Sequence, residues 1–157
     1  MKFRYARLRY TPQPGQQFSI LRPIIPIGLR YQNRTFPGLY SALLDSGADN
    51  CIFHAEVGEE LGIDVRSGEG KVFSGMGFGK TTGYSHLVDI SVGGLWVPRC
   101  LVSFSYGLSR DSVTYPGQKE GFHYGILGQE GFFDKFKVTF DREAEDIELR
   151  PKKSATS

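Results

Sequence analysis

The sequence lacks long apolar runs, a strong net charge, many cysteines and histidines at metal-ligand spacing. It contains no run of about 18 apolar residues, so a membrane-spanning helix is not expected. Its formal net charge is only +2, which gives no electrostatic case for nucleic acid or an anionic membrane as partner. Two cysteines, Cys51 and Cys100, are too few for a disulfide framework, and His54, His86 and His123 lack the spacing of metal ligands. We therefore expect no membrane, nucleic-acid or metal partner.

Chain length and the first residues predict a small protein of the cytoplasm. At 157 residues the chain is long enough for one domain with a working core and short for two. We expect a domain over residues 1–150 and a flexible polar tail over residues 151–157. Residues 1–5 lead into no apolar signal-peptide core, and two free thiols suit a reducing compartment, so a cytoplasmic location is predicted.

Glycine and aromatic side chains are plentiful, and their pattern is typical of strands. The chain has 20 glycines, and 13% of its residues are aromatic, which favours strands and turns. Residues 84–92 are one such predicted strand. Pro23 and Pro26 predict that the strand around them lies at a sheet edge. Short helices are expected over residues 54–62 and 129–136, so the fold class predicted is all-β with one or two short helices.

The densest glycine region, residues 74–83, invites comparison with phosphate-binding loops. The P-loop pattern requires a glycine where Ser74 stands, and dinucleotide fingerprints beginning in this region also fail. No helical pattern follows the glycines, whereas a strand pattern does. A hairpin with a glycine-rich tip is therefore favoured over a nucleotide site.

The chemically informative stretch is residues 42–49, Ala-Leu-Leu-Asp-Ser-Gly-Ala-Asp. It predicts a buried strand that delivers the Asp45 carboxylate onto a tight turn, in which Gly47 supplies backbone freedom and Ser46 a hydrogen bond. An acid directly after a buried strand is costly unless it is paired, hydrogen-bonded or functional. The structural alternative is an acid that only caps the turn.

Two segments resemble the signatures of one enzyme family. Residues 43–49 resemble the hydrophobic-hydrophobic-Asp-Thr/Ser-Gly-Ala signature of aspartic proteases, and residues 124–128 (Tyr-Gly-Ile-Leu-Gly) resemble the same family's hydrophobic-hydrophobic-Gly element. The order and separation of the two are similar to those of the single-lobe, retropepsin-like branch. Together they favour a functional Asp45 over a turn-capping one.

The resemblance implies a closed, all-β, retropepsin-like barrel in which the hairpin at residues 74–83 is a flap that closes over bound peptide. It implies an aspartic endopeptidase without a cofactor, acting on an extended peptide or protein. The implied catalytic residues are Asp45, Ser46 and Gly47. The implied substrate-binding residues are Ala48, Asp49, Gly75, Met76, Gly77, Phe78 and Gly79. The implied supports of the active-site loop are Ile126, Leu127 and Gly128.

Counting the signature then predicts a homodimer. Two carboxylates that share a proton can act as base towards water and as acid towards the substrate carbonyl. The sequence has only one Asp-Ser/Thr-Gly, at Asp45, so the second aspartate would come from another copy of the chain. In such a dimer Ser46 would hydrogen-bond across the two-fold axis.

The chain also departs from the family, and another class of function stays open. Retroviral enzymes carry an arginine directly after the second element, where it pairs with the acid at the position of Asp49, and here that residue is Gln129. Residues 105–122 form a long polar connection, which is typical of a functional or mobile loop. The alternative function is a non-catalytic peptide- or protein-binding or dimerisation module on the same fold.

Overall fold

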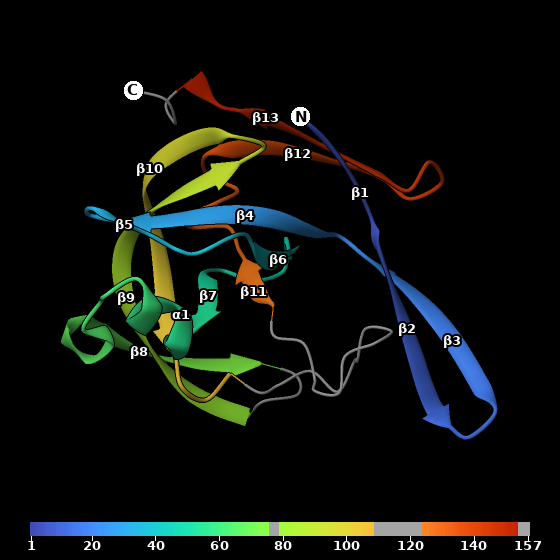
Figure 1. Ribbon diagram of the computed structural model, residues 1–157, viewed down its shortest axis with the longest axis horizontal. Coiled ribbons are helices and arrows are strands. Elements are labelled where there is room, and N and C mark those ends of the chain that lie inside the picture. Colours follow the sequence, from blue (N-terminus) through green and yellow to red (C-terminus); the bar gives the residue numbers. More distant parts are fainter. Residues whose placement is uncertain (76–78, 109–123, 154–157) are drawn as a thin grey trace.

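The computed structural model describes residues 1–75, 79–108 and 124–153 (Figure 1). Within these residues, thirteen strands, one α-helix and one short 3₁₀ helix follow one another. In order they are β1 (Lys2–Arg4), β2 (Ala6–Gln13), β3 (Gln16–Arg22), β4 (Ile24–Tyr31), β5 (Arg34–Thr35), β6 (Tyr40–Leu44), β7 (Cys51–His54), α1 (Ala55–Glu60), η1 (Val65–Ser67), β8 (Glu69–Gly75), β9 (Gly79–Val92), β10 (Leu95–Ser105), β11 (Gly125–Leu127), β12 (Phe136–Asp141) and β13 (Asp146–Pro151).

Six strands form a closed barrel, as predicted. They are hydrogen-bonded in the order β4-β6-β11-β7-β10-β9, and pairing of β4 with β9 closes the ring. The short β11 lies parallel to β6 and antiparallel to β7, and β7 lies parallel to β10. β8 extends the sheet beyond β9 and forms with it the predicted hairpin. The all-β fold class is therefore confirmed.

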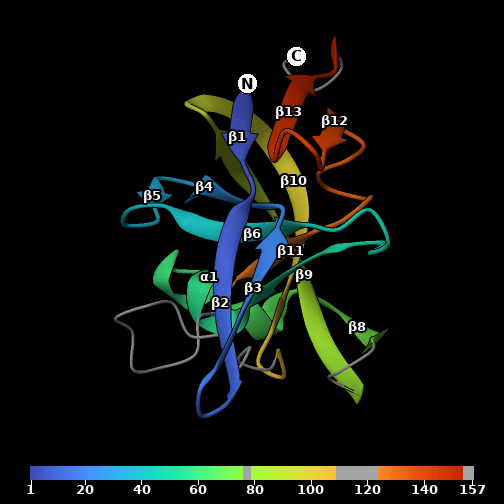
Figure 2. The ribbon, with the colours of Figure 1, turned by 90° about the vertical axis from the view of Figure 1, so that its right-hand side faces the viewer.

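Two smaller sheets flank the barrel. The β2–β3 hairpin projects from it, and β1, β13 and β12 form a separate sheet at one end (Figures 1 and 2). This sheet brings the two ends of the chain together, since the amino group of Met1 donates to the Leu149 carbonyl at 2.8 Å. Pro151 is the last residue of β13, and residues 154–157 of the predicted tail lie outside the described residues.

Large aromatic side chains fill much of the core. Phe53, Phe104, Phe132 and Phe136 are almost fully buried. The rings of Phe132 and Phe136 stack with centroids 4.8 Å apart. Tyr40 packs edge-on against Phe53, and burial raises the pKa of its phenol. The core thus holds β6 and β7, the strands on either side of the Asp45 loop.

One of the two predicted helices is present and the other is wrong. α1 lies within the predicted range 54–62, and the ring of His54 caps it by accepting the Glu56 N–H at 3.3 Å. Residues 131–135, by contrast, are a turn rather than a helix. Gly131 has φ +99°, which lies outside the α-helical region. The spacing of Phe132 and Phe136 fits a helix, but the backbone at Gly131 makes this segment a turn. Within the described chain no helix is long and apolar enough to cross a membrane.

The edge position predicted for the Pro26 strand is also wrong. β4 pairs with β6 through residues 24–27 and with β9 through residues 28–30. It is therefore a strand of the barrel wall with a neighbour on each side, and not an edge strand. Proline is tolerated because β4 changes partner along its length. Around Pro26 only the β6 side is paired, and the missing N–H leaves no gap in a ladder with β9.

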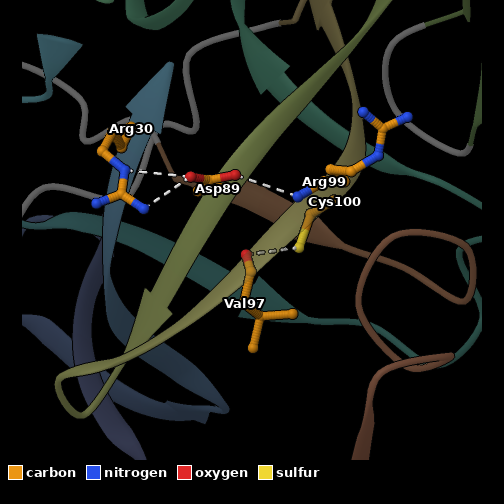
Figure 3. A network of polar contacts seen from close by, with 5 residues as sticks. All are labelled: Arg30, Asp89, Val97, Arg99 and Cys100. Atoms are coloured by element: carbon orange, nitrogen blue, oxygen red, sulfur yellow. Dashed lines mark hydrogen bonds and ion pairs between the residues drawn. The ribbon is translucent and has the colours of Figure 1, made fainter. Parts of the chain in front are cut away.

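A polar network fastens the closure of the barrel, as Figure 3 shows. The Arg30 guanidinium of β4 donates twice to one Asp89 carboxylate oxygen of β9, at 2.8 and 3.1 Å. The other oxygen accepts the backbone N–H of Arg99 at 3.2 Å, in the irregular stretch of β10 between Val97 and Cys100. Arg99 has φ +55°, and this bond holds its left-handed backbone in place. One carboxylate therefore joins three strands.

The two cysteines are free and buried, which leads to a prediction about their reactivity. Cys51 and Cys100 have no exposed surface, and burial raises the pKa of each thiol to about 12. Because the thiolate is the reactive form, neither should react with Ellman's reagent at pH 8 in the folded protein. Both should react after unfolding in guanidinium. A thiol that reacted at once without denaturant would contradict this burial.

Candidate active site

The Asp45 loop begins where β6 leaves the core. Backbone bonds fix both sides of the turn: Asp45 N–H donates to the Leu127 carbonyl at 3.1 Å, and Ala48 N–H donates to the Asp45 carbonyl at 3.2 Å. The side chain is held as well, because its Oδ1 accepts the Gly47 N–H at 2.9 Å. Asp45 is partly exposed. Its carboxylate is oriented by its own turn, and its backbone is hydrogen-bonded to β11.

The second predicted element, β11 with Gly128, lies directly behind this loop. Gly128 N–H points to the Cys51 sulfur at 3.4 Å, and Gln129 N–H donates to the Ala48 carbonyl at 2.8 Å. A Cβ on Gly128 would come within 2.3 Å of the Asn50 carbonyl oxygen and 2.7 Å of the Ala48 carbonyl oxygen. The close approach of the two segments therefore requires glycine at this position.

Gln129 has a structural role that sequence reasoning missed. Its side-chain amide donates to the Ser46 carbonyl at 2.7 Å, so it braces the loop from the side. Beside it, the Asn50 amide donates to the Glu130 carboxylate at 3.1 Å. The Asp49 side chain is exposed and has no hydrogen bond or ion pair within the described part of the chain. Only the departure from arginine at position 129 was visible in the sequence.

A hollow of about 600 Å³ opens beside Asp45. Its floor is formed by Asp45 and residues 47–50, with Ile52 and Ile126 from the barrel, and its other wall by residues 71–74 of β8. The hairpin predicted from the glycines therefore faces the predicted acid. A segment of extended backbone on one side and a carboxylate on the other can bind a peptide strand and act on it.

Five of the thirteen predicted site residues line this hollow, and two more support it from behind. Those that line the hollow are Asp45, Gly47, Ala48, Asp49 and Ile126. Leu127 and Gly128 are buried behind the loop, where they support it. Gly75 pairs with Gly79 at the end of the β8–β9 hairpin, and Met76, Gly77 and Phe78 lie outside the described residues. Residues 109–122 of the predicted long connection also lie outside them.

No metal-like cluster accompanies the hollow. Across residues 1–75, 79–108 and 124–153, no group of three or more histidine, cysteine, aspartate or glutamate side chains is placed to hold an ion. Two carboxylates, Asp45 and Asp49, line the hollow, and a positioned carboxylate can transfer protons.

Comparison with known proteins assigns the family. Residues 38–130, which include both elements, match the sequence profile of the aspartyl protease family, and the chain belongs to that family. Its fold is similar to that of a retropepsin-like aspartic protease from Rickettsia conorii, with a TM-score of 0.53, 13% identity, and coverage of 81% of this chain and 89% of that one. The retropepsin-like fold predicted from the sequence is thereby confirmed.

Two further solved structures match the chain with lower TM-scores and slightly higher identities. The EIAV protease complexed with the inhibitor HBY-793 has a TM-score of 0.44 and 18% identity, covering 76% of this chain and 88% of that one. The retroviral protease-like domain of Ddi1 from Leishmania major has a TM-score of 0.46 and 17% identity, covering 84% and 96%. Among curated proteins no sequence matches the chain.

Proposed function

We propose that the protein is an aspartic endopeptidase that hydrolyses peptide bonds as a homodimer, with one Asp45 from each chain. One observation carries the proposal: the Asp45 carboxylate lies on the floor of a peptide-sized hollow, oriented by the Gly47 N–H at 2.9 Å. The chain has a single Asp-Ser-Gly sequence, so we propose that the second carboxylate comes from a second copy. Membership of the aspartyl protease family supports the choice of this acid.

Two carboxylates that face one water can supply both proton transfers of amide hydrolysis. Carboxylates about 3 Å apart cannot easily both ionise, so they share one proton. The ionised Asp45 takes a proton from the water, whose oxygen attacks the peptide carbonyl carbon. The protonated Asp45 of the second copy donates to the carbonyl oxygen. A proton then passes to the leaving nitrogen as the C–N bond breaks.

Ser46 and Gly47 have separate proposed roles beside the acid. Ser46 is exposed at the turn, and its hydroxyl is proposed to hydrogen-bond the same loop of the second copy. Gly47 gives the substrate backbone room to approach. A Cβ there would meet Asp45 Oδ1 at 3.3 Å and would crowd the carboxylate that Gly47 orients.

The substrate is proposed to be an extended peptide or protein segment held between two backbones. Ala48 and Asp49 would bind it from the floor, and the β8–β9 hairpin, including residues 75–79, would act as a flap above it. In such binding the peptide pairs as an added strand with exposed backbone of the protein. The main-chain hydrogen bonds accept many peptide sequences, and pockets for the peptide's side chains provide the selectivity. The hollow between the Asp45 loop and β8 supports this arrangement.

Both cysteines are free thiols, which supports the cytoplasm as the proposed location. Disulfides are the usual fate of cysteines in oxidising compartments, whereas buried free thiols are ordinary in a reducing one. Fractionation of cells that express the protein would test this part of the proposal.

Digestion of a diverse peptide mixture at pH values from about 4 to 8 tests the proposed activity, because carboxylate pairs titrate in or near this range. We expect cleavage within peptides that stops on addition of an aspartic-protease inhibitor which mimics the transition state. Products identified by mass spectrometry would report the specificity at the same time. A stable dimer that cleaved nothing in the mixture would instead favour a peptide-binding module on the same fold.

A further inference from the structure

Lys71 is a partly buried lysine on the wall of the hollow. Side chains along β8 alternate, with Lys71 and Phe73 partly buried and Val72 between them 69% exposed. The partly buried face is the one turned towards the body of the protein. Lys71 contributes to the wall of the hollow opposite Asp45. Its position is therefore set by the strand and not by a loop.

The Lys71 ammonium has no partner within the described chain. No hydrogen bond or ion pair joins it to any described residue, although Asp45 and Asp49 line the same hollow. Among the described lysines the other partly buried one, Lys135, lies 4.0 Å from Asp134. The ammonium of Lys71 is therefore free to pair with an anionic group of a bound substrate.

The charges of the hollow lie on opposite sides. Asp45 and Asp49 belong to the floor, whereas Lys71 belongs to the β8 wall, and the two sides are not joined by an ion pair. Between them, Ile52 and Ile126 supply apolar surface. A peptide strand in this space can offer N–H groups to the floor acids, and carbonyl or carboxylate oxygens to Lys71. Of these oxygens, a carboxylate forms the stronger bond with the ammonium. A glutamate side chain fits best, since its methylene groups can cover the apolar surface while its carboxylate reaches the ammonium.

We propose that Lys71 is a specificity-determining residue that selects substrates with a glutamate in this hollow. The inference rests on the proposed function, because it names the substrate of the same site. A two-fold dimer presents the hollow twice. The preference for glutamate should therefore occur at one position on each side of the cleaved bond.

Paired peptides that differ only in glutamate or glutamine at one position test the inference. We expect the wild type to cleave the glutamate peptide with a kcat/KM about tenfold or more above that of the glutamine peptide, the size of a hydrogen bond to a charged group. Lys71→Gln should reduce this ratio to about one. The Lys71→Glu variant should cleave a peptide with lysine at this position faster than the glutamate peptide, because the sign of the selecting charge is reversed.

Lys137→Gln is the matched control. Lys137 is an exposed lysine on β12 and is not part of the hollow. Its replacement by glutamine changes the net charge by the same amount as Lys71→Gln. The glutamate-to-glutamine ratio should be unchanged in this variant. Raising the salt concentration should lower the ratio of the wild type, because screening weakens a partly exposed ion pair.

Binding to Asp45→Asn separates this inference from the proposed function. Fluorescence anisotropy of labelled peptides reads the hollow without chemistry, and the glutamate peptide should bind about tenfold more tightly than the glutamine peptide. Equal affinities, or a preference that survives Lys71→Gln, would overturn the role of Lys71 while Asp45-dependent cleavage could still stand. A Lys71-dependent preference in binding, without cleavage by the wild type, would overturn the protease and keep the selection.

Discussion

Asp45→Asn is expected to lower kcat/KM for peptide cleavage by at least about 1,000-fold, within the range that general acid–base catalysis contributes. Asparagine keeps an oxygen at the position of Oδ1, so the bond from Gly47 N–H can persist and the loop can hold its shape. What it lacks is a group that can take a proton from water. The loss should therefore lie in kcat, measured on a peptide found in the digestion experiment.

The control for this variant is Asp64→Asn. Asp64 is exposed before η1, and its side chain makes no capping hydrogen bond there. This variant should keep the activity of the wild type. Circular dichroism and thermal unfolding should show both variants folded. An Asp45→Asn protein that retained full activity after repeated purification would rule out Asp45 as the catalytic acid.

Gly128→Ala is expected to be among the most destabilising alanine substitutions in the chain. Its Cβ would lie 2.3 Å from the Asn50 carbonyl oxygen and 2.6 Å from the Asn50 carbonyl carbon, which are backbone atoms. Backbone cannot turn aside as a side chain can, so β11 and the Asp45 loop would have to separate. We expect the free energy of unfolding to fall by at least about 2 kcal/mol. For a chain of this size Tm should fall by about 4–8 °C.

Gly70→Ala is the matched control for the glycine substitution. On β8 the added Cβ would have no neighbour closer than 3.7 Å, which is ordinary contact. Its free energy of unfolding should stay within about 0.5 kcal/mol of the wild type. Urea unfolding of both variants measures the difference. Equal stabilities would mean that the close approach of Gly128 to residues 48–50 is not a feature of the folded protein.

The sequence predicted the parts of the site that depend on backbone geometry. The run that ends in Asp45 predicts a buried strand followed by a tight turn, and the run before Gly128 predicts a second strand. The structure has all three elements. The placement of the glycine-rich hairpin opposite Asp45 came from the family resemblance. Strand pairing over long sequence distances, such as β11 beside β6, cannot be read from local pattern alone.

Features that depend on the tertiary environment were missed or mispredicted. The spacing of Phe132 and Phe136 is compatible with a helix and also with a compact turn, and Gly131 decides for the turn through its positive φ. Pro26 predicted an edge strand because proline has no backbone N–H to donate. The barrel tolerates it because β4 changes partner along its length, and this change follows from closure of the barrel, which local sequence does not reveal. Lys71 gave no signal, since only the fold places it opposite the acids.

The central claim, a catalytic pair built from two chains, is tested most directly by mixing subunits. Wild type and Asp45→Asn are unfolded together in equal amounts, refolded, and assayed at constant total chain concentration. If both Asp45 residues are needed, only wild-type homodimers are active, and activity should fall to about a quarter of the unmixed wild type. Activity of about half, proportional to the wild-type fraction, would show that one chain suffices and would contradict the shared pair.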